Sequence, residues 1–247
     1  MIKAEHLRFC YPGHDEPIIE NCSFTLGKGE VMAILGQNGS GKTTLIRLLL
    51  GLLMPQAGNL RTKGRLSYVP QEAQIPFDYP VREVVLMGAC ARNGIFATPR
   101  RRDYQRTDDI LRKVGLAGRG SYGFSRLSGG QKQMAMIARA LVCDPDVIVM
   151  DEPTSALDYR NQDKVLLSMA GMAAEGKAVV FTTHCPSQAL NVADRVILVG
   201  GDTGIQHGTA DDILTANTLS ALYQMPIRRH RTADGEIVFP KYSSIKQ

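Results

Sequence analysis

Short apolar runs recur along the chain and alternate with longer amphipathic segments. Four of these runs contain β-branched residues and almost no charge, and they lie at residues 31–35, 146–150, 178–182 and 196–199. Runs of this kind are typical of strands that are buried on both faces. Their alternation with amphipathic segments predicts a parallel sheet covered by crossover helices. Two earlier segments, residues 2–8 and 22–26, predict strands of a more exposed antiparallel sheet.

The middle of the chain shows a different periodicity. From about residue 80 to residue 141, apolar positions recur at helical spacing and no convincing strand pattern interrupts them. We therefore expect an α/β fold in which a helical subdomain, residues 81–141, is inserted into a core. The core comprises residues 1–80 and 142–225 and includes the small antiparallel β subdomain. Residues 226–247 should form a small hairpin or an extended arm.

Composition excludes several classes of protein. The 247 residues are 44% hydrophobic and 21% charged, which is ordinary for a globular chain and unlike a disordered, collagen-like or coiled-coil one. The five cysteines are scattered and form no C-x-x-C pair. This argues against a disulfide framework or a zinc site and favours a reducing compartment.

Neither the apolar segments nor the net charge indicates a membrane-spanning protein. The most apolar stretch, residues 45–54, contains Arg47 and Gly51 and is far shorter than the roughly 20 residues of a transmembrane helix. The first residues lack the apolar region of a signal peptide, so we expect a soluble protein. The formal net charge of +5 is compatible with nucleic acid, an anionic membrane surface or a phosphorylated ligand.

The strongest local motif is a phosphate-binding loop. Residues 36–43 read GQNGSGKT, match G-x-x-x-x-G-K-[ST], and stand between an apolar run and a helical segment. Glycines let backbone N–H groups point at phosphate oxygens, and the following helix presents its positive N-terminal end. Lys42 should reach the β- and γ-phosphates, and the Thr43 hydroxyl should ligate Mg²⁺. The phosphate-binding residues expected here are Gly36, Asn38, Gly39, Ser40, Gly41, Lys42, Thr43 and Thr44.

Two carboxylates follow the apolar run at residues 147–150. Asp151 and Glu152 would lie at the carboxyl edge of a parallel sheet, where ligands bind. There Asp151 could enter the metal shell, and Glu152 could polarise a water molecule in line with the γ-phosphate. An acidic pair on the surface after a strand would give the same sequence pattern. A phosphate-binding loop alone also does not distinguish kinases, GTPases, helicases and transport ATPases.

Residues 127–131, LSGGQ, help to choose between these interpretations of the acidic pair and between these classes of protein. Together with the later DEPTS, they resemble the ABC (ATP-binding cassette) ATPases, and the resemblance covers nearly the whole chain with the motifs in family order. It implies that Tyr11, rather than its core-like neighbour Phe9, stacks on adenine. It also implies that Gln71 ligates Mg²⁺ and water, that Asp158 shapes a dimer interface and that His184 contacts the γ-phosphate. The catalytic residues expected are Glu152, His184, Gln71 and Lys42, and the Mg²⁺ ligands expected are Thr43, Gln71 and Asp151.

The LSGGQ segment provides a second helix N-terminus that could bind an anion. The resemblance implies that two copies pack head to tail as a homodimer, with each LSGGQ facing the other copy's phosphate loop across ATP. The nucleotide contacts expected from this segment are Ser128, Gly129, Gly130 and Gln131.

Residues 73–81 and the tail resemble the importer branch that serves iron chelates, haem and cobalamin, and molybdate importers look similar. This implies a peripheral subunit on the cytoplasmic face of the bacterial inner membrane. It would act on a separate transmembrane permease dimer, fed by a periplasmic or lipoprotein substrate-binding protein. Residues 71–87 would form the groove for the permease.

The rival class is a soluble ABC ATPase acting on nucleic acid, but such proteins usually resemble paired cassettes or carry a long coiled coil. We therefore expect no nucleic-acid partner.

Overall fold

The structure, a computed structural model, describes residues 1–72, 75–90, 98–200, 204–232 and 235–241. Its largest sheet has six strands in the order β5-β6-β7-β3-β8-β9. These strands are β3 (Val31–Leu35), β5 (Leu66–Val69), β6 (Val147–Met150), β7 (Ala178–Thr183), β8 (Arg195–Val199) and β9 (Ile205–Thr209). All neighbours pair in parallel except β9, which runs antiparallel to β8. The four strands expected from the apolar runs are confirmed.

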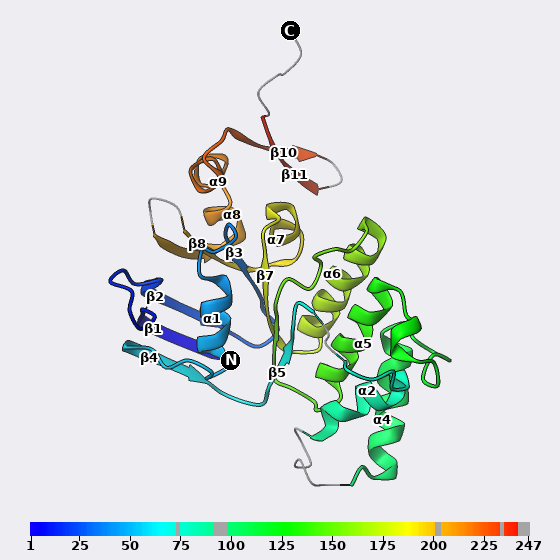
Figure 1. Cartoon of the computed structure of the whole chain (residues 1–247). Helices are drawn as coiled ribbons and strands as arrows, with labels where there is room; N and C mark the ends of the chain where they lie inside the picture. Colours follow the sequence, from blue (N-terminus) through cyan, green and yellow to red (C-terminus); the bar gives the residue numbers. More distant parts are fainter. Residues whose placement is uncertain (73–74, 91–97, 201–203, 233–234, 242–247) are drawn as a thin grey trace.

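A second sheet lies beside the first and is antiparallel, as the sequence predicts. Its order is β2-β1-β4, from β1 (Ile2–Phe9), β2 (Ile19–Leu26) and β4 (Ala57–Thr62). Helix α1 (Lys42–Leu49) lies between the two sheets (Figure 1), and its apolar face joins one hydrophobic core with residues of both. Strand β3 alternates between cores: Met32 and Ile34 pack on this side, whereas the other three residues face a second core. The strand that leads into the phosphate loop is therefore held from both faces.

The opposite side of the large sheet is covered by helices. Here α5 (Gly129–Leu141), α6 (Tyr159–Ala174) and α7 (Pro186–Val192) share the second core with α2 (Val81–Leu86) and α4 (Arg101–Lys113). Two short 3₁₀ segments, Met87–Ala89 and Phe124–Arg126, complete this part. In the described parts of residues 81–141 there is no strand, as the helical periodicity predicts. No helix among the described residues is both long and apolar enough to cross a bilayer.

The C-terminal region packs beyond α7 (Figure 1). It consists of α8 (Ala210–Ile213), α9 (Ala216–Tyr223) and a hairpin of β10 (Ile227–Thr232) and β11 (Gly235–Pro240). Arg229 ties the hairpin down, because its guanidinium donates to the Leu214 carbonyl at 3.1 Å and contacts the carboxylates of Asp211 and Glu236. Of the two forms expected for this tail, the chain adopts the hairpin.

Candidate functional site

The phosphate loop opens onto a cavity of about 370 Å³. The loop joins β3 to α1, and Gly41 immediately before the helix has a φ of 105°, a conformation that L side chains rarely adopt. The cavity is lined by Ile18, Asn38, Gly39, Gly41, Lys42, Thr43, Thr44, Gln71 and Glu152. The fold thus brings most of the expected phosphate-loop residues together with Gln71 and Glu152, which lie far away in the sequence.

Two of the expected loop residues face away from this cavity. Gly36 and Ser40 pack on the other side of the loop against Val199 and Gly200, where Ser40 lines a separate hollow. The Ser40 hydroxyl is buried there and has no hydrogen-bond partner among the described residues. Any phosphate contact from these two residues would therefore come from the backbone N–H groups.

Lys42 is the buried cation of the cavity. Its side chain is 6% exposed, and Nζ donates to the carbonyl oxygens of Gly36 at 2.9 Å and Gln37 at 3.0 Å. The same nitrogen lies 3.6 Å from Oε1 of Glu152. The ammonium is thus held against the curve of the loop with one carboxylate beside it, where it can bind a multiply charged anion.

One hydroxyl fixes both carboxylate residues at the end of β6. Thr182, on the neighbouring strand β7, donates to Oδ1 of Asp151 at 2.7 Å and accepts the backbone N–H of Glu152 at 2.7 Å. Glu152 has a φ of 41°, an uncommon conformation for a residue with a side chain. Strain of this kind concentrates at functional sites because the surrounding structure must hold it. Sequence reasoning did not single out Thr182, although it closes an apolar strand two residues before His184.

Three side chains converge on the carboxylate of Glu152. Lys42 approaches Oε1, Gln71 donates to Oε2 from Nε2 at 3.4 Å, and Nδ1 of His184 lies 3.7 Å from Oε2. The carboxylate itself is 14% exposed, whereas the His184 side chain is 60% exposed. These residues follow four strands of one sheet at their carboxyl ends, the usual position of ligand sites in α/β folds. The arrangement can orient a water molecule between a carboxylate, an amide and an imidazole.

The expected Mg²⁺ ligands supply oxygen donors, which this ion prefers. Thr43 and Gln71 line the cavity, and Asp151 lies behind it, 6% exposed. The described residues contain no cluster of three His, Cys, Asp or Glu side chains, so water and phosphate oxygens would have to complete the shell. Burial, followed by the charge of Asp151, raises the pKa of the Tyr68 phenol. The donor set fits Mg²⁺ that is held jointly with a nucleotide.

Tyr11 lies next to the cavity rather than in its wall. Its ring meets Phe9 edge to face with centroids 5.0 Å apart, and its hydroxyl is 3.2 Å from Oγ1 of Thr44, which lines the cavity. Phe9 is buried in the core, whereas Tyr11 is half-buried. Tyr11 is therefore partly exposed close to the phosphate loop, where a flat ring could stack on it.

The LSGGQ segment forms the beginning of α5, away from this cavity. Ser128 caps the helix by accepting the Gln131 N–H at 3.4 Å, and the Gln131 side chain accepts the Ser128 N–H at 3.1 Å. Such a reciprocal cap leaves the other first-turn N–H groups available to an anion. None of Ser128, Gly129, Gly130 and Gln131 lines the cavity at the phosphate loop. One chain therefore carries two separate helix ends that are suited to phosphate.

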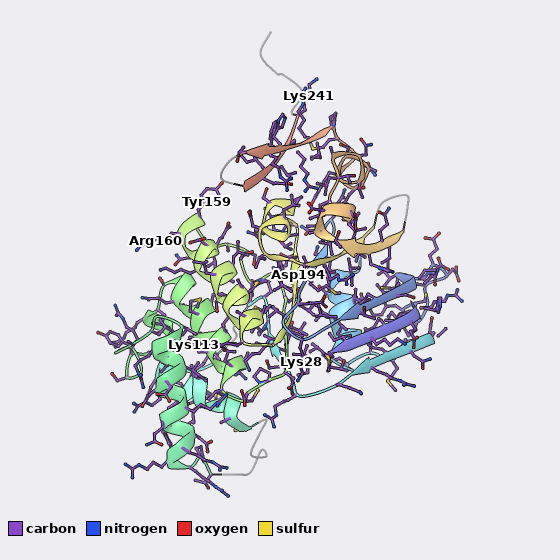
Figure 2. The ribbon with its side chains drawn as sticks, turned by 180° about the vertical axis from the view of Figure 1, so that it is seen from behind. Lys28, Lys113, Tyr159, Arg160, Asp194 and Lys241 are labelled. Atoms are coloured by element: carbon purple, nitrogen blue, oxygen red, sulfur yellow. The ribbon has the colours of Figure 1, made fainter. Side chains whose placement is uncertain are left out.

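Asp158 connects the LSGGQ segment to α6. Its carboxylate caps α6 by accepting the N–H of Asn161 at 2.8 Å and its side-chain amide at 2.9 Å. Asn161 in turn packs against Gly130. The next residue, Tyr159, is 90% exposed and projects from the end of α6 (Figure 2). Asp158 thus orders a helix end next to an exposed aromatic side chain.

Gly130→Ala should destabilise the fold, because a Cβ at this position would meet Cγ of Asn161 at 2.4 Å. We expect a loss of about 1–3 kcal/mol in the free energy of unfolding, measured by urea denaturation. Gly129→Ala is the matched control, since its Cβ would find only Leu157 Cδ2 at 3.9 Å. Equal stability of the two variants would contradict this packing.

Comparisons with known proteins agree with this geometry. A family model described as ABC transporter matches residues 19–155. The molybdate import ATP-binding protein MolC of Haemophilus influenzae is 37% identical over 242 residues, which cover 98% of this chain and 95% of that protein. The manganese transport system ATP-binding protein MntB of Bacillus subtilis is 31% identical, with 85% and 88% covered. A solved inward-facing transporter, assigned to the metal-chelate ABC type, superposes with a TM-score of 0.91 at 36% identity and 98% and 97% coverage.

Proposed function

The chain belongs to the ABC transporter family of ATP-binding subunits, which are ATPases coupled to transport, and we propose that it drives import through a separate permease. The observation that carries the proposal is the convergence of Lys42, Gln71 and His184 on Glu152 at the mouth of the phosphate loop. A loop that only binds phosphate would not require three side chains to converge on one carboxylate, whereas hydrolysis of ATP does.

In the proposed reaction, water attacks the γ-phosphorus of ATP in line with the leaving oxygen. Glu152 accepts the proton of that water, and Lys42 with the loop N–H groups neutralises charge on the phosphoryl oxygens. Mg²⁺, held by Thr43, Gln71 and Asp151, would supply further charge neutralisation at the phosphates. His184 contacts the γ-phosphate and keeps the water beside Glu152, and Tyr11 stacks on adenine.

Two copies would assemble head to tail around two ATP molecules. This proposal is supported by the separation of the two anion-binding helix ends in one chain, since Ser128 to Gln131 do not reach the chain's own cavity. A second copy supplies its α5 N-terminus to the exposed side of the nucleotide, so that ATP forms part of the interface.

The proposed permease groove follows the β5 strand, across residues 71–87, of which 73 and 74 lie outside the described part of the chain. Phe77 is 68% exposed and Tyr79 is 39% exposed, and their rings meet edge to face 6.0 Å apart. Exposed aromatic pairs are typical anchors of protein interfaces. The groove begins at Gln71, so a bound permease can influence Glu152 through that side chain. This function would hold the subunit at the cytoplasmic face of the bacterial inner membrane.

Phe77→Ser should weaken coupling. Loss of an aromatic anchor costs about 2 kcal/mol at an interface, so we expect the affinity for the permease to weaken roughly thirtyfold and its stimulation of ATPase activity at limiting permease to fall accordingly. The measurement is the ratio of ATP turnover with and without permease in detergent or liposomes. Tyr104→Ser, at an exposed tyrosine of α4, is the control. An unchanged ratio in the Phe77 variant would remove this groove from the proposal.

For the cargo, we propose a metal chelate such as an iron–siderophore complex or haem, or cobalamin of the same branch. The superposed transporter of metal-chelate type favours this class. Molybdate is the second candidate, favoured by the 37% identity to MolC. Uptake of each cargo by the complex in proteoliposomes, with its permease and periplasmic or lipoprotein binding protein, distinguishes them. Failure of this chain to co-purify with a permease would overturn the importer assignment itself.

A further inference from the structure

The last turn of α9 contacts two loops of the ATP site. The Tyr223 hydroxyl donates to the backbone carbonyl of His184 at 2.8 Å. The side-chain amide of Gln37, within the phosphate loop, donates to the carbonyl of Leu222. Carbonyls in the last turn of a helix have no partner within the helix, so Gln37 also caps α9. A single helix end is thus seated against both the phosphate loop and the residue that follows β7.

His184 depends on its backbone for its position. Its side chain is 60% exposed and lies 3.7 Å from Glu152, too far for a firm hydrogen bond. The peptide group that joins His184 to Cys185 is held from both edges. The Thr183 hydroxyl accepts its N–H, that of Cys185, at 3.0 Å and donates to Gln188 at 3.0 Å. Tyr223 donates to its carbonyl, that of His184. These two contacts restrain the backbone that carries the imidazole, and so they limit where the Cα–Cβ bond of His184 points.

The helix that presents Tyr223 is itself well anchored. Leu219 and Leu222 are buried, and the Ser220 hydroxyl accepts the N–H of Ile227 at 2.8 Å, which ties α9 to the hairpin. Strand β11 of that hairpin packs against α7, the helix that begins two residues after His184. Burial raises the pKa of the Tyr223 phenol, so its hydroxyl keeps its proton at neutral pH and remains a donor.

We propose that Tyr223 is a positioning residue for His184, through which α9 and the C-terminal hairpin hold the imidazole in register with Glu152. The inference rests on the proposed role of His184 at the γ-phosphate. Tyr223 does not line the cavity at the phosphate loop. Its loss therefore affects the hydrolytic step and leaves nucleotide binding in place.

Tyr223→Phe removes only the hydroxyl and tests this directly. In the full-length protein, we expect kcat for ATP hydrolysis to fall roughly threefold to tenfold, the range of one lost hydrogen bond, with KM for ATP within about twofold. The same substitution in a His184→Ala background should have no further effect on kcat. Tyr104→Phe, at an exposed tyrosine of α4, is the matched control and should behave as wild type.

The outcomes separate this inference from the proposed function. If His184→Ala keeps near-normal kcat, the role of His184 is wrong and the inference falls with it. If His184→Ala is impaired but Tyr223→Phe turns over ATP like wild type, only the positioning role is overturned. Equal losses of kcat from Tyr223→Phe with and without His184 would identify a structural role that does not act through the imidazole.

Discussion

Glu152→Gln should lower kcat for ATP hydrolysis roughly a hundredfold or more while ATP still binds, since a general base contributes about 10²–10⁴ to rate. The substitution keeps the size of the side chain and the N–H bond to Thr182, so the strained backbone at this residue should persist. It removes the negative charge on which Lys42, Gln71 and His184 converge and replaces one carboxylate oxygen with an amide group that cannot accept a proton from water. Steady-state phosphate release measures kcat, and calorimetry with ATP measures affinity.

The blocked variant should also accumulate as an ATP-bound dimer in size-exclusion chromatography, because binding continues while hydrolysis does not. Glu175→Gln is the control: Glu175 pairs with Lys113 on the surface, and its loss should leave kcat unchanged. Near-normal turnover by the Glu152 variant would show that another group accepts the proton.

Lys42→Ala should abolish most ATP binding. The ammonium is buried in the cavity wall and is already held by two loop carbonyls. Binding of the phosphates therefore costs little additional conformational entropy of the lysine side chain. Hydrogen bonds to charged groups are worth about 1.5–3 kcal/mol each, so Kd should rise at least roughly tenfold to a hundredfold. The variant also leaves Glu152 without its cation, which adds repulsion against the nucleotide.

Calorimetry with ATP and Mg²⁺ measures this loss, and a thermal melt shows that the variant is folded. Lys28→Ala, at an exposed lysine outside the cavity wall, should bind ATP like wild type. An unchanged Kd in the Lys42 variant would mean that the backbone N–H groups and Mg²⁺ suffice for binding.

The sequence predicts those elements whose burial is complete. The strands β3, β6, β7 and β8 lie almost entirely within the core, and their apolar runs show it. Three further strands, β4, β5 and β9, were not predicted. Their residues are largely exposed or half-buried, and their pairing depends on neighbours far along the chain, so neither an apolar run nor a regular alternation marks them.

The residues of the candidate site also fall into a group that the sequence predicts and a group that it does not. The phosphate loop and LSGGQ are contiguous, and the turn and helix cap that each needs are encoded locally. Thr182, Asn161 and Tyr223 act through groups that the fold brings close, such as Asp151 at a separation of 31 residues from Thr182. A threonine, an asparagine and a tyrosine in ordinary helices and strands carry no local mark of such a role, so only the tertiary structure identifies them.

The hydroxyl of Thr182 has a mechanical consequence. It bridges Asp151 and the backbone of Glu152, and it belongs to the strand that leads directly to His184. A tilt of β7 would therefore move the proposed metal ligand and the proposed base together, along with the strand end that carries His184. Thr182 thus links the ends of β6 and β7, so that a displacement of either strand should be felt by both carboxylate residues.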